Sequence, residues 1–112
     1  MSQRNSTHRK VLEKIASNPE TFKIKDVLVS AIEPNLFHKK NLMAQPDIVF
    51  YCKRGELYIL EYKGNGNGEM LQRAQRQLNH AVFWIGKYLD IDPNKIHPLI
   101  VTSQNSKLRS IL

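Results

Sequence analysis

Apolar residues recur along much of the chain at steps of three and four, the spacing that places them on one face of a helix. Residues 8–17 and 22–33 each carry such a stripe, and Pro19 and Pro34 follow them as stops. The longest stripe runs through residues 69–89. Its members are Leu71, Ala74, Leu78, Ala81, Val82, Ile85 and Leu89. The pattern therefore predicts two helices in the first third of the chain and a long helix later.

Short runs of β-branched and aromatic residues mark strands between these helices. The clearest are residues 48–52 and 57–60, further strands are expected at 35–40 and 99–101, and a short helix is expected at 107–112. The resulting order is helix, helix, three strands, helix, strand. It predicts an α/β fold with a mixed sheet of about four strands flanked by helices. A chain of 112 residues is expected to form one domain.

Residues 45–63 form the stretch richest in candidate chemistry, with the sequence QPDIVFYCKRGELYILEYK. The tripeptide at 53–55, Lys-Arg-Gly, separates its two apolar runs. A three-residue turn that ends in a left-handed glycine is a common hairpin connection. Such a turn pairs Cys52 with Glu56, and this pair fixes the register of every residue further out along the two strands.

That register places Asp47 opposite Glu61 at the open end of the hairpin, with Cβ atoms about 5 Å apart. Side chains alternate along a strand, so Lys63 shares the face of Glu61. Paired carboxylates suit a hard cation such as Mg²⁺, which activates water and polarises phosphate, and a neighbouring lysine can orient that water. The cluster therefore indicates phosphodiester hydrolysis. The alternative is an exposed Glu61–Lys63 pair on an edge strand.

Pro46-Asp47 and Glu61-Tyr62-Lys63 together resemble the signature of the PD-(D/E)xK nuclease superfamily. The resemblance covers most of the chain and implies a restriction-endonuclease-like fold, as in Holliday junction resolvases and recombination exonucleases. It implies that Asp47 and Glu61 hold Mg²⁺ or Mn²⁺. It further implies that the Tyr62 carbonyl is another metal ligand and that Lys63 is the catalytic lysine.

Two further features of the superfamily concern residues outside the hairpin. Many members carry another acidic metal ligand ahead of the hairpin. Four residues are candidates for this ligand here, and their spacing does not choose among them. These are Glu13, Glu20, Asp26 and Glu33. The alternative for each is a solvated surface charge. Recombination-type members carry a Gln-Leu pair on the following helix, with a tyrosine four positions after the glutamine. Gln77-Leu78 matches this pair, although residue 81 is Ala where the tyrosine would be. Gln77 is therefore a catalytic candidate that would orient the substrate or Lys63. The alternative is an amide on the helix surface without a catalytic role.

Lysine and arginine outnumber aspartate and glutamate by 17 to 10, which gives a formal net charge of +7. Such a charge favours a polyanionic partner, and basic residues on one face of the 69–89 helix can follow a phosphate backbone. The predicted nucleic-acid contacts are Lys39, Lys40, Arg73, Arg76, His80 and Lys87. A solvated loop or helix face is the alternative for each.

Several classes of protein are disfavoured. Cys52 is the single cysteine and is expected to be a buried structural thiol, and no Cys/His cluster has zinc spacing. The glycine-rich residues 64–68 match no nucleotide-binding fingerprint and are expected to form a substrate-side loop, or else a flexible linker. No apolar run approaches the length of a membrane span and no apolar signal region starts the chain, so a cytoplasmic protein without a membrane partner is expected.

The sequence therefore predicts a metal-dependent nuclease, and the resemblance implies DNA as its substrate. Because a chain this small encloses little DNA, a homodimer is expected, and a Holliday junction resolvase acting as a dimer is one alternative. A non-catalytic nucleic-acid-binding module and a protein-interaction subunit are the others. The sequence does not decide between DNA and RNA, or between single-stranded, double-stranded and branched substrates. It also does not decide between endonucleolytic and exonucleolytic cleavage.

Overall fold

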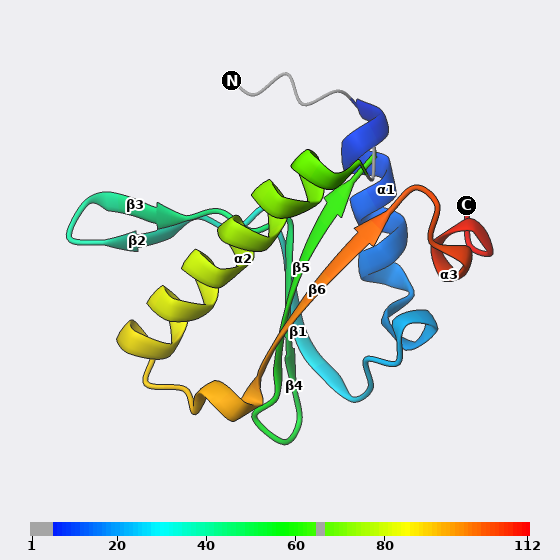
Figure 1. Ribbon diagram of the computed structural model, residues 1–112. Helices are drawn as coiled ribbons and strands as arrows, with labels where there is room; N and C mark the ends of the chain where they lie inside the picture. The colour runs from blue at the N-terminus through cyan, green and yellow to red at the C-terminus, as the bar shows by residue number, and fades with distance from the viewer. Residues whose placement is uncertain (1–5, 65–66) are drawn as a thin grey trace.

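A four-stranded sheet forms the centre of the chain, whose computed structural model describes residues 6–64 and 67–112. The strand order is β1–β4–β5–β6 (Figure 1). β1 (Val27–Ile32), β4 (Ile48–Cys52) and β5 (Leu57–Lys63) are antiparallel neighbours, and β6 (Ile96–Thr102) runs parallel to β5. The predicted mixed sheet is confirmed.

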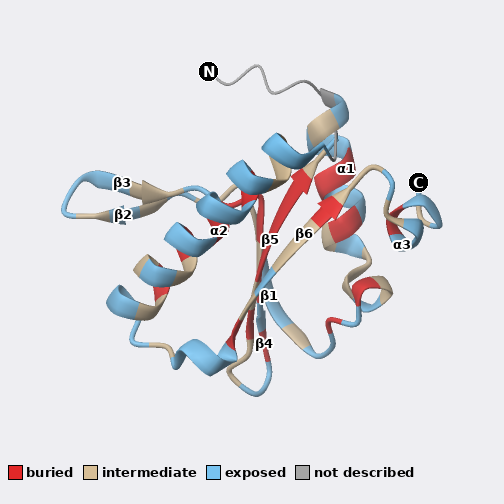
Figure 2. Cartoon of the chain, in the orientation of Figure 1, coloured by how far each residue is buried: buried red, intermediate tan, exposed pale blue. Residues whose placement is uncertain are grey.

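The two long helices, α1 (Ser6–Ser17) and α2 (Gly68–Tyr88), cover opposite faces of this sheet. Alternation along the strands produces the two layers, because Phe50 packs with the α1 core and Ile59 with the α2 core. Figure 2 shows burial concentrated in the sheet strands and on the inner side of α1, while much of α2 is exposed. The chain is therefore a three-layer α/β structure.

The β4–β5 hairpin has the register that the turn chemistry predicts. Gly55 adopts a left-handed φ of 80°, and the Cys52 amide donates to the Glu56 carbonyl at 2.8 Å. Pairing continues outward to Ile48 opposite Leu60. Asp47 and Glu61 are the next residues outward from this pair, so the fold brings these carboxylates to the same end of the sheet.

The helix predicted over residues 22–33 is wrong. A short 3₁₀ turn, η1 (Pro19–Phe22), is followed by the edge strand β1. The segment's apolar residues fit a helical period, but they include β-branched side chains, and left-handed backbone at Asp26 (φ 57°) and Glu33 (φ 51°) interrupts the chain on either side. Pairing with β4 therefore decides that residues 27–32 form a strand and not a helix.

The strand predicted at residues 35–40 exists in shortened form and belongs to a separate sheet. β2 (Leu36–His38) pairs with β3 (Asn41–Ala44), which the sequence pattern does not predict. Lys39 and Lys40 form the turn with φ of 51° and 76°, the left-handed pair that a tight hairpin turn requires. The hairpin projects from the main sheet beside α2 (Figure 1).

The C-terminal part agrees with the predicted helix–strand order. α2 begins where the Asn67 side chain accepts from the Met70 amide at 2.9 Å. η2 (Pro93–Lys95) leads into β6, which is longer than predicted, and α3 (Ser106–Arg109) buries Leu108 against the α1 layer. Within the described ranges, no helix has the length and apolar character needed to cross a membrane.

Candidate active site

Asp47 and Glu61 lie at the open end of the β4–β5 hairpin and are almost completely buried, with 4% and 5% of their surfaces exposed. The backbone amide of Tyr62 donates to Asp47 Oδ2 at 2.7 Å, which holds the carboxylate against β5. Asp47 lies just before β4 and Glu61 lies within β5, so the hairpin register itself positions both groups.

The environment of Glu61 disfavours its ionised form. Burial raises the pKa of Glu61 to about 8, and the nearby charge of Asp47 contributes in the same direction, while Lys63 opposes the shift. Glu61 Oε2 is buried and has no hydrogen-bond partner among the described residues. A buried carboxylate oxygen without a partner costs stability. A divalent cation beside Asp47 and Glu61 would relieve both penalties, so the residues present fit such an ion.

A cavity of about 250 Å³ opens between this end of the sheet and α2. Its walls bring together four of the predicted catalytic and metal-binding side chains with one predicted nucleic-acid contact. They are Asp47, Glu61, Lys63, Gln77 and His80. The Tyr62 side chain points to the opposite layer, where it packs with the α1 core.

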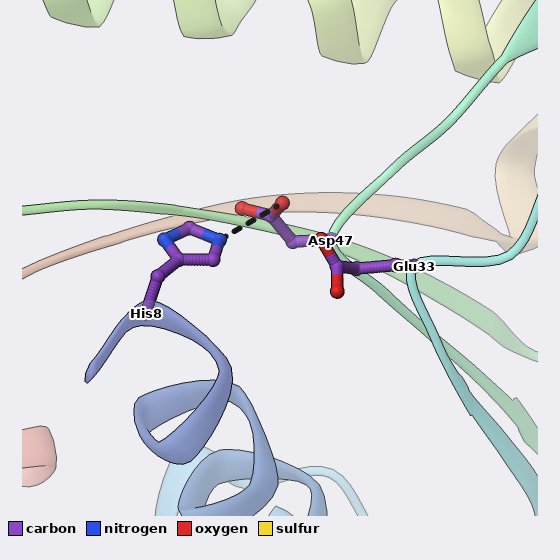
Figure 3. Close-up of side chains that lie close together, drawn as sticks. All are labelled: His8, Glu33 and Asp47. Carbon is purple, nitrogen blue, oxygen red and sulfur yellow. Dashed lines mark ion pairs between the residues drawn. The ribbon is translucent and has the colours of Figure 1, made fainter. Parts of the chain in front are cut away.

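Two residues lie beside Asp47 that the sequence pattern does not place there. His8, Glu33 and Asp47 each offer a potential ligand atom, and these atoms lie within 4.8 Å of one another (Figure 3). His8 Nε2 is 3.6 Å from Asp47 Oδ1, and the Glu33 carboxylate accepts from Arg9 Nη1 at 2.9 Å. Imidazole and carboxylate groups are both common metal ligands.

Glu33 is thus the one of the four acidic candidates that reaches this cluster. Its backbone amide donates to the Asp47 carbonyl at 2.7 Å, because β1 pairs with β4. Glu13 is exposed and pairs with Arg9, and the remaining candidates, Glu20 and Asp26, border a different depression.

The position of His8 in the sequence is itself a signal for this site. It lies three, four and seven positions before Val11, Leu12 and Ile15, all of which are buried. A helix residue at this spacing lies on the apolar face and is directed toward the sheet. A polar side chain in that stripe could therefore have been recognised as a candidate site residue.

The predicted nucleic-acid contacts lie on two elements. Arg73, Arg76 and Lys87 are exposed on α2, and Lys39 and Lys40 lie at the turn of the β2–β3 hairpin, outside the walls of the cavity. The His80 ring is 2.9 Å from the Met43 carbonyl and so ties the hairpin to α2. The predicted loop at 64–68 includes residues 65 and 66, which lie outside the described residues.

In the presence of a chelator and at a pH above about 8, where Glu61 is ionised, Glu61→Gln is expected to stabilise the protein by about 2 kcal/mol, because it removes a buried negative charge beside Asp47. The raised pKa of Glu61 gives the effect its pH dependence. The free energy of unfolding of the wild type is highest below the ordinary carboxyl pKa and falls as pH rises toward about 8. The Glu61→Gln variant lacks this dependence. Urea unfolding across this pH range measures the difference.

Glu13→Gln is the matched control, since it removes the same charge from a side chain that is 58% exposed. An exposed charge contributes little to stability, so this variant is expected to follow the wild type. Equal behaviour of Glu61→Gln and Glu13→Gln would show that neither burial nor the charge of Asp47 makes the ionised form of Glu61 costly.

Two solved structures share the fold of this chain. EndoMS in its dsDNA2 complex superposes with a TM-score of 0.51 over 88% of the chain at 21% identity. A repair endonuclease from Pyrococcus abyssi superposes with a TM-score of 0.52 over 100% of the chain at 12% identity. The chain spans 38% and 45% of these proteins, less than half of either. No family model and no curated protein matches the sequence.

Proposed function

We propose that this chain is a metal-dependent nuclease of the PD-(D/E)xK type that hydrolyses phosphodiester bonds, with DNA as the favoured substrate. The observation that carries the proposal is the burial of Asp47 and Glu61 side by side, with Lys63, in the wall of one cavity. A fold shared with EndoMS in its dsDNA2 complex and with a repair endonuclease supports it, as does the net charge of +7.

Asp47 and Glu61 would hold the metal, Mg²⁺ or Mn²⁺, with the Tyr62 carbonyl as a further ligand. Oxygen ligands from carboxylates are those that Mg²⁺ takes. His8 and Glu33 each offer a ligand atom within 4.8 Å of one on Asp47, so they would be further ligands on the Asp47 side of the ion. When bound, the ion would supply polarisation of the phosphate and compensation of its negative charge.

The chain's own residues would carry out the remaining tasks. The Lys63 ammonium group donates hydrogen bonds, so it would orient the attacking water and stabilise negative charge that develops on the phosphate. The Tyr62 amide keeps the Asp47 carboxylate in a fixed orientation through its 2.7 Å hydrogen bond. Gln77 enters from α2, where it would position the substrate or Lys63.

A non-catalytic binding module is the less favoured alternative. Phosphate binding requires exposed cations, whereas two adjacent buried carboxylates lower stability and repel a polyanion. Metal binding would explain their presence in a protein of net charge +7. A homodimer, and with it the Holliday junction resolvase alternative, stays a prediction that sedimentation of the free protein tests.

A panel of labelled substrates tests the proposed function. Linear duplex, single-stranded, flapped and four-way-junction DNA, with a matched RNA, are incubated with the protein in Mg²⁺ and in a chelator. We expect at least one DNA to be cut in Mg²⁺ and none in the chelator. Failure of the folded protein to cut any substrate with Mg²⁺ or Mn²⁺ would contradict the proposal. Symmetric paired nicks in the junction by a dimer would favour the resolvase alternative.

Removal of Arg73 and Arg76 is expected to weaken DNA binding at every sequence. Each lost phosphate contact reduces the slope of log K against log salt by about 0.9 on duplex DNA, so the double alanine variant should lose about 1.8. Titrations in a chelator, over a range of salt concentrations, measure this slope without cleavage.

The double variant Lys107→Ala, Arg109→Ala is the control, because it removes the same charge from exposed residues of α3. It is expected to keep the wild-type slope. Equal losses in the two double variants would mean that overall charge, and no particular contact, sets the affinity. An unchanged slope in the Arg73, Arg76 variant would place the nucleic acid elsewhere.

A further inference from the structure

Aromatic side chains gather at the surface where the β2–β3 hairpin meets the C-terminal half of α2. The Trp84 and Tyr88 rings stack with centroids 4.8 Å apart and planes 5° apart, and His38 of the hairpin stacks on Tyr88 at 4.0 Å. Phe37 and Phe83 are 62% and 59% exposed. We call Phe37, His38, Trp84 and Tyr88 the aromatic platform.

A cavity of about 270 Å³ lies between the two elements of this platform. Phe37 lines it from the hairpin, and Trp84 and Tyr88 line it from α2. Asn35 lines the same cavity, and its side-chain Oδ1 accepts from Gln45 Nε2 at 2.7 Å. These three aromatic rings and an amide, beside the aliphatic side chains of Leu36, Met43, Ile85 and Leu89, suit a planar heterocycle, which presents two π faces and a polar edge.

This second cavity continues the candidate active site along the same helix. Gln77 and His80 line the first cavity, and Trp84 and Tyr88 follow at steps of four on the same face of α2. Gln77 and Trp84 are about 10 Å apart along the axis, at 1.5 Å per residue. A strand that is held at Asp47 and Glu61 can therefore extend over the aromatic platform.

The charge around the platform selects the kind of partner. Residues 34–46 and 70–89, which build both walls, contain no aspartate or glutamate. Lys87 Nζ lies 5.5 Å from the Trp84 and Tyr88 ring centroids, and Lys39 and Lys40 lie at the hairpin turn. A polyanion is attracted to such a surface. A second copy of this chain would place like charges opposite one another, which disfavours self-association here.

We propose that the aromatic platform binds the unpaired nucleotides of a single-stranded nucleic acid by stacking, while Lys87 contacts the adjoining phosphate. This inference rests on the proposed function, because it names strands with unpaired bases as the substrate class of the same site. Stacking tolerates any base, since every base has a π face. The platform would thus guide a single strand into the cavity without selecting its sequence.

The fluorescence of Trp84 gives a direct test, because it is the single tryptophan of the chain. The protein is titrated in a chelator with a short oligothymidylate and with an abasic phosphodiester strand of equal length and charge. We expect the oligothymidylate to quench Trp84 and to bind about tenfold more tightly than the abasic strand, since stacking requires the bases.

Phe37→Ala is expected to remove most of this preference, because the exposed Phe37 ring forms one wall of the cavity. Tyr51→Ala is the matched control: Tyr51 is an aromatic residue of β4 that is 41% exposed and lines neither cavity. Thermal unfolding checks that both variants fold. The control should keep the wild-type preference and quenching.

Equal affinity for the two strands, or equal effects of Phe37→Ala and Tyr51→Ala, would overturn the proposal. A wild-type dimer that Phe37→Ala dissociates would assign the surface to a second copy of the chain and overturn it as well. Cleavage assays in Mg²⁺ distinguish failure of the proposed nuclease activity from failure of the proposed strand binding. Quenching without cleavage contradicts the nuclease alone, and cleavage with equal binding of both strands contradicts the platform alone.

Discussion

Asp47→Asn is expected to lower the rate of phosphodiester cleavage at least ~1,000-fold, because loss of the metal removes several kcal/mol of transition-state stabilisation. Asparagine keeps the size of the side chain and an oxygen that can accept from the Tyr62 amide. The fold should therefore persist. Glu61→Gln is expected to have a comparable effect. Single-turnover cleavage in Mg²⁺, with circular dichroism of each variant, measures both.

Glu13→Gln provides the matched control for these two variants. It removes one carboxylate from the exposed side of α1, where Glu13 pairs with Arg9 at 3.5 Å. Its cleavage rate is expected to equal that of the wild type. A correctly folded Asp47→Asn or Glu61→Gln protein that cleaves at the wild-type rate would exclude that carboxylate from the reaction.

Lys63→Ala is expected to reduce kcat by about 10²- to 10⁴-fold, the range for loss of a positioned group that acts in proton transfer or charge stabilisation. Lys63 ends β5 in a half-buried position and shares the cavity with Asp47 and Glu61, so its ammonium group is close to the proposed reaction centre. KM should change much less, because surface cations supply most of the phosphate binding.

Lys107→Ala is the control for lost positive charge, since Lys107 is exposed on α3. It should leave kcat unchanged. If Lys63→Ala instead raised KM while kcat stayed at the wild-type value, Lys63 would be a binding residue without a part in the chemical step.

The geometry around Asp47 and Glu61 could be predicted because it depends on local structure. Gly55 fixes a three-residue turn, the turn fixes the register, and the register brings the two carboxylates together within a span of the chain that folds on itself. The alternation of side chains then places Lys63 on the same face. None of these steps requires knowledge of distant parts of the chain.

Glu33 could not be chosen in the same way. The β1 segment fits a helical period and a strand equally well by its apolar residues, and its pairing with β4 is a tertiary contact. Once the segment is a strand, the register Ile32–Ile48 places Glu33 beside Asp47. Because a helix was predicted for this segment, neither the edge strand β1 nor the position of Glu33 beside Asp47 could be predicted.

The aromatic platform depends on tertiary packing as well. Trp84 and Tyr88 both lie on α2, but His38, which stacks on Tyr88, is brought there by the β2–β3 hairpin. β3 has the sequence NLMA, which lacks the β-branched and aromatic residues that mark strands. The position of the hairpin beside α2 depends on tertiary contacts such as that of His80 with the Met43 carbonyl, which the sequence pattern does not reveal.

Bound Mn²⁺ and cleavage, measured on the same samples during one metal titration, test the central claim most directly. Electron paramagnetic resonance of free Mn²⁺ gives the occupancy, and a labelled strand gives the rate. We predict that occupancy and rate rise together in the wild type and that Asp47→Asn loses both. Cleavage that proceeds in the chelator, or in Asp47→Asn without bound Mn²⁺, would contradict a metal-dependent nuclease built on these carboxylates.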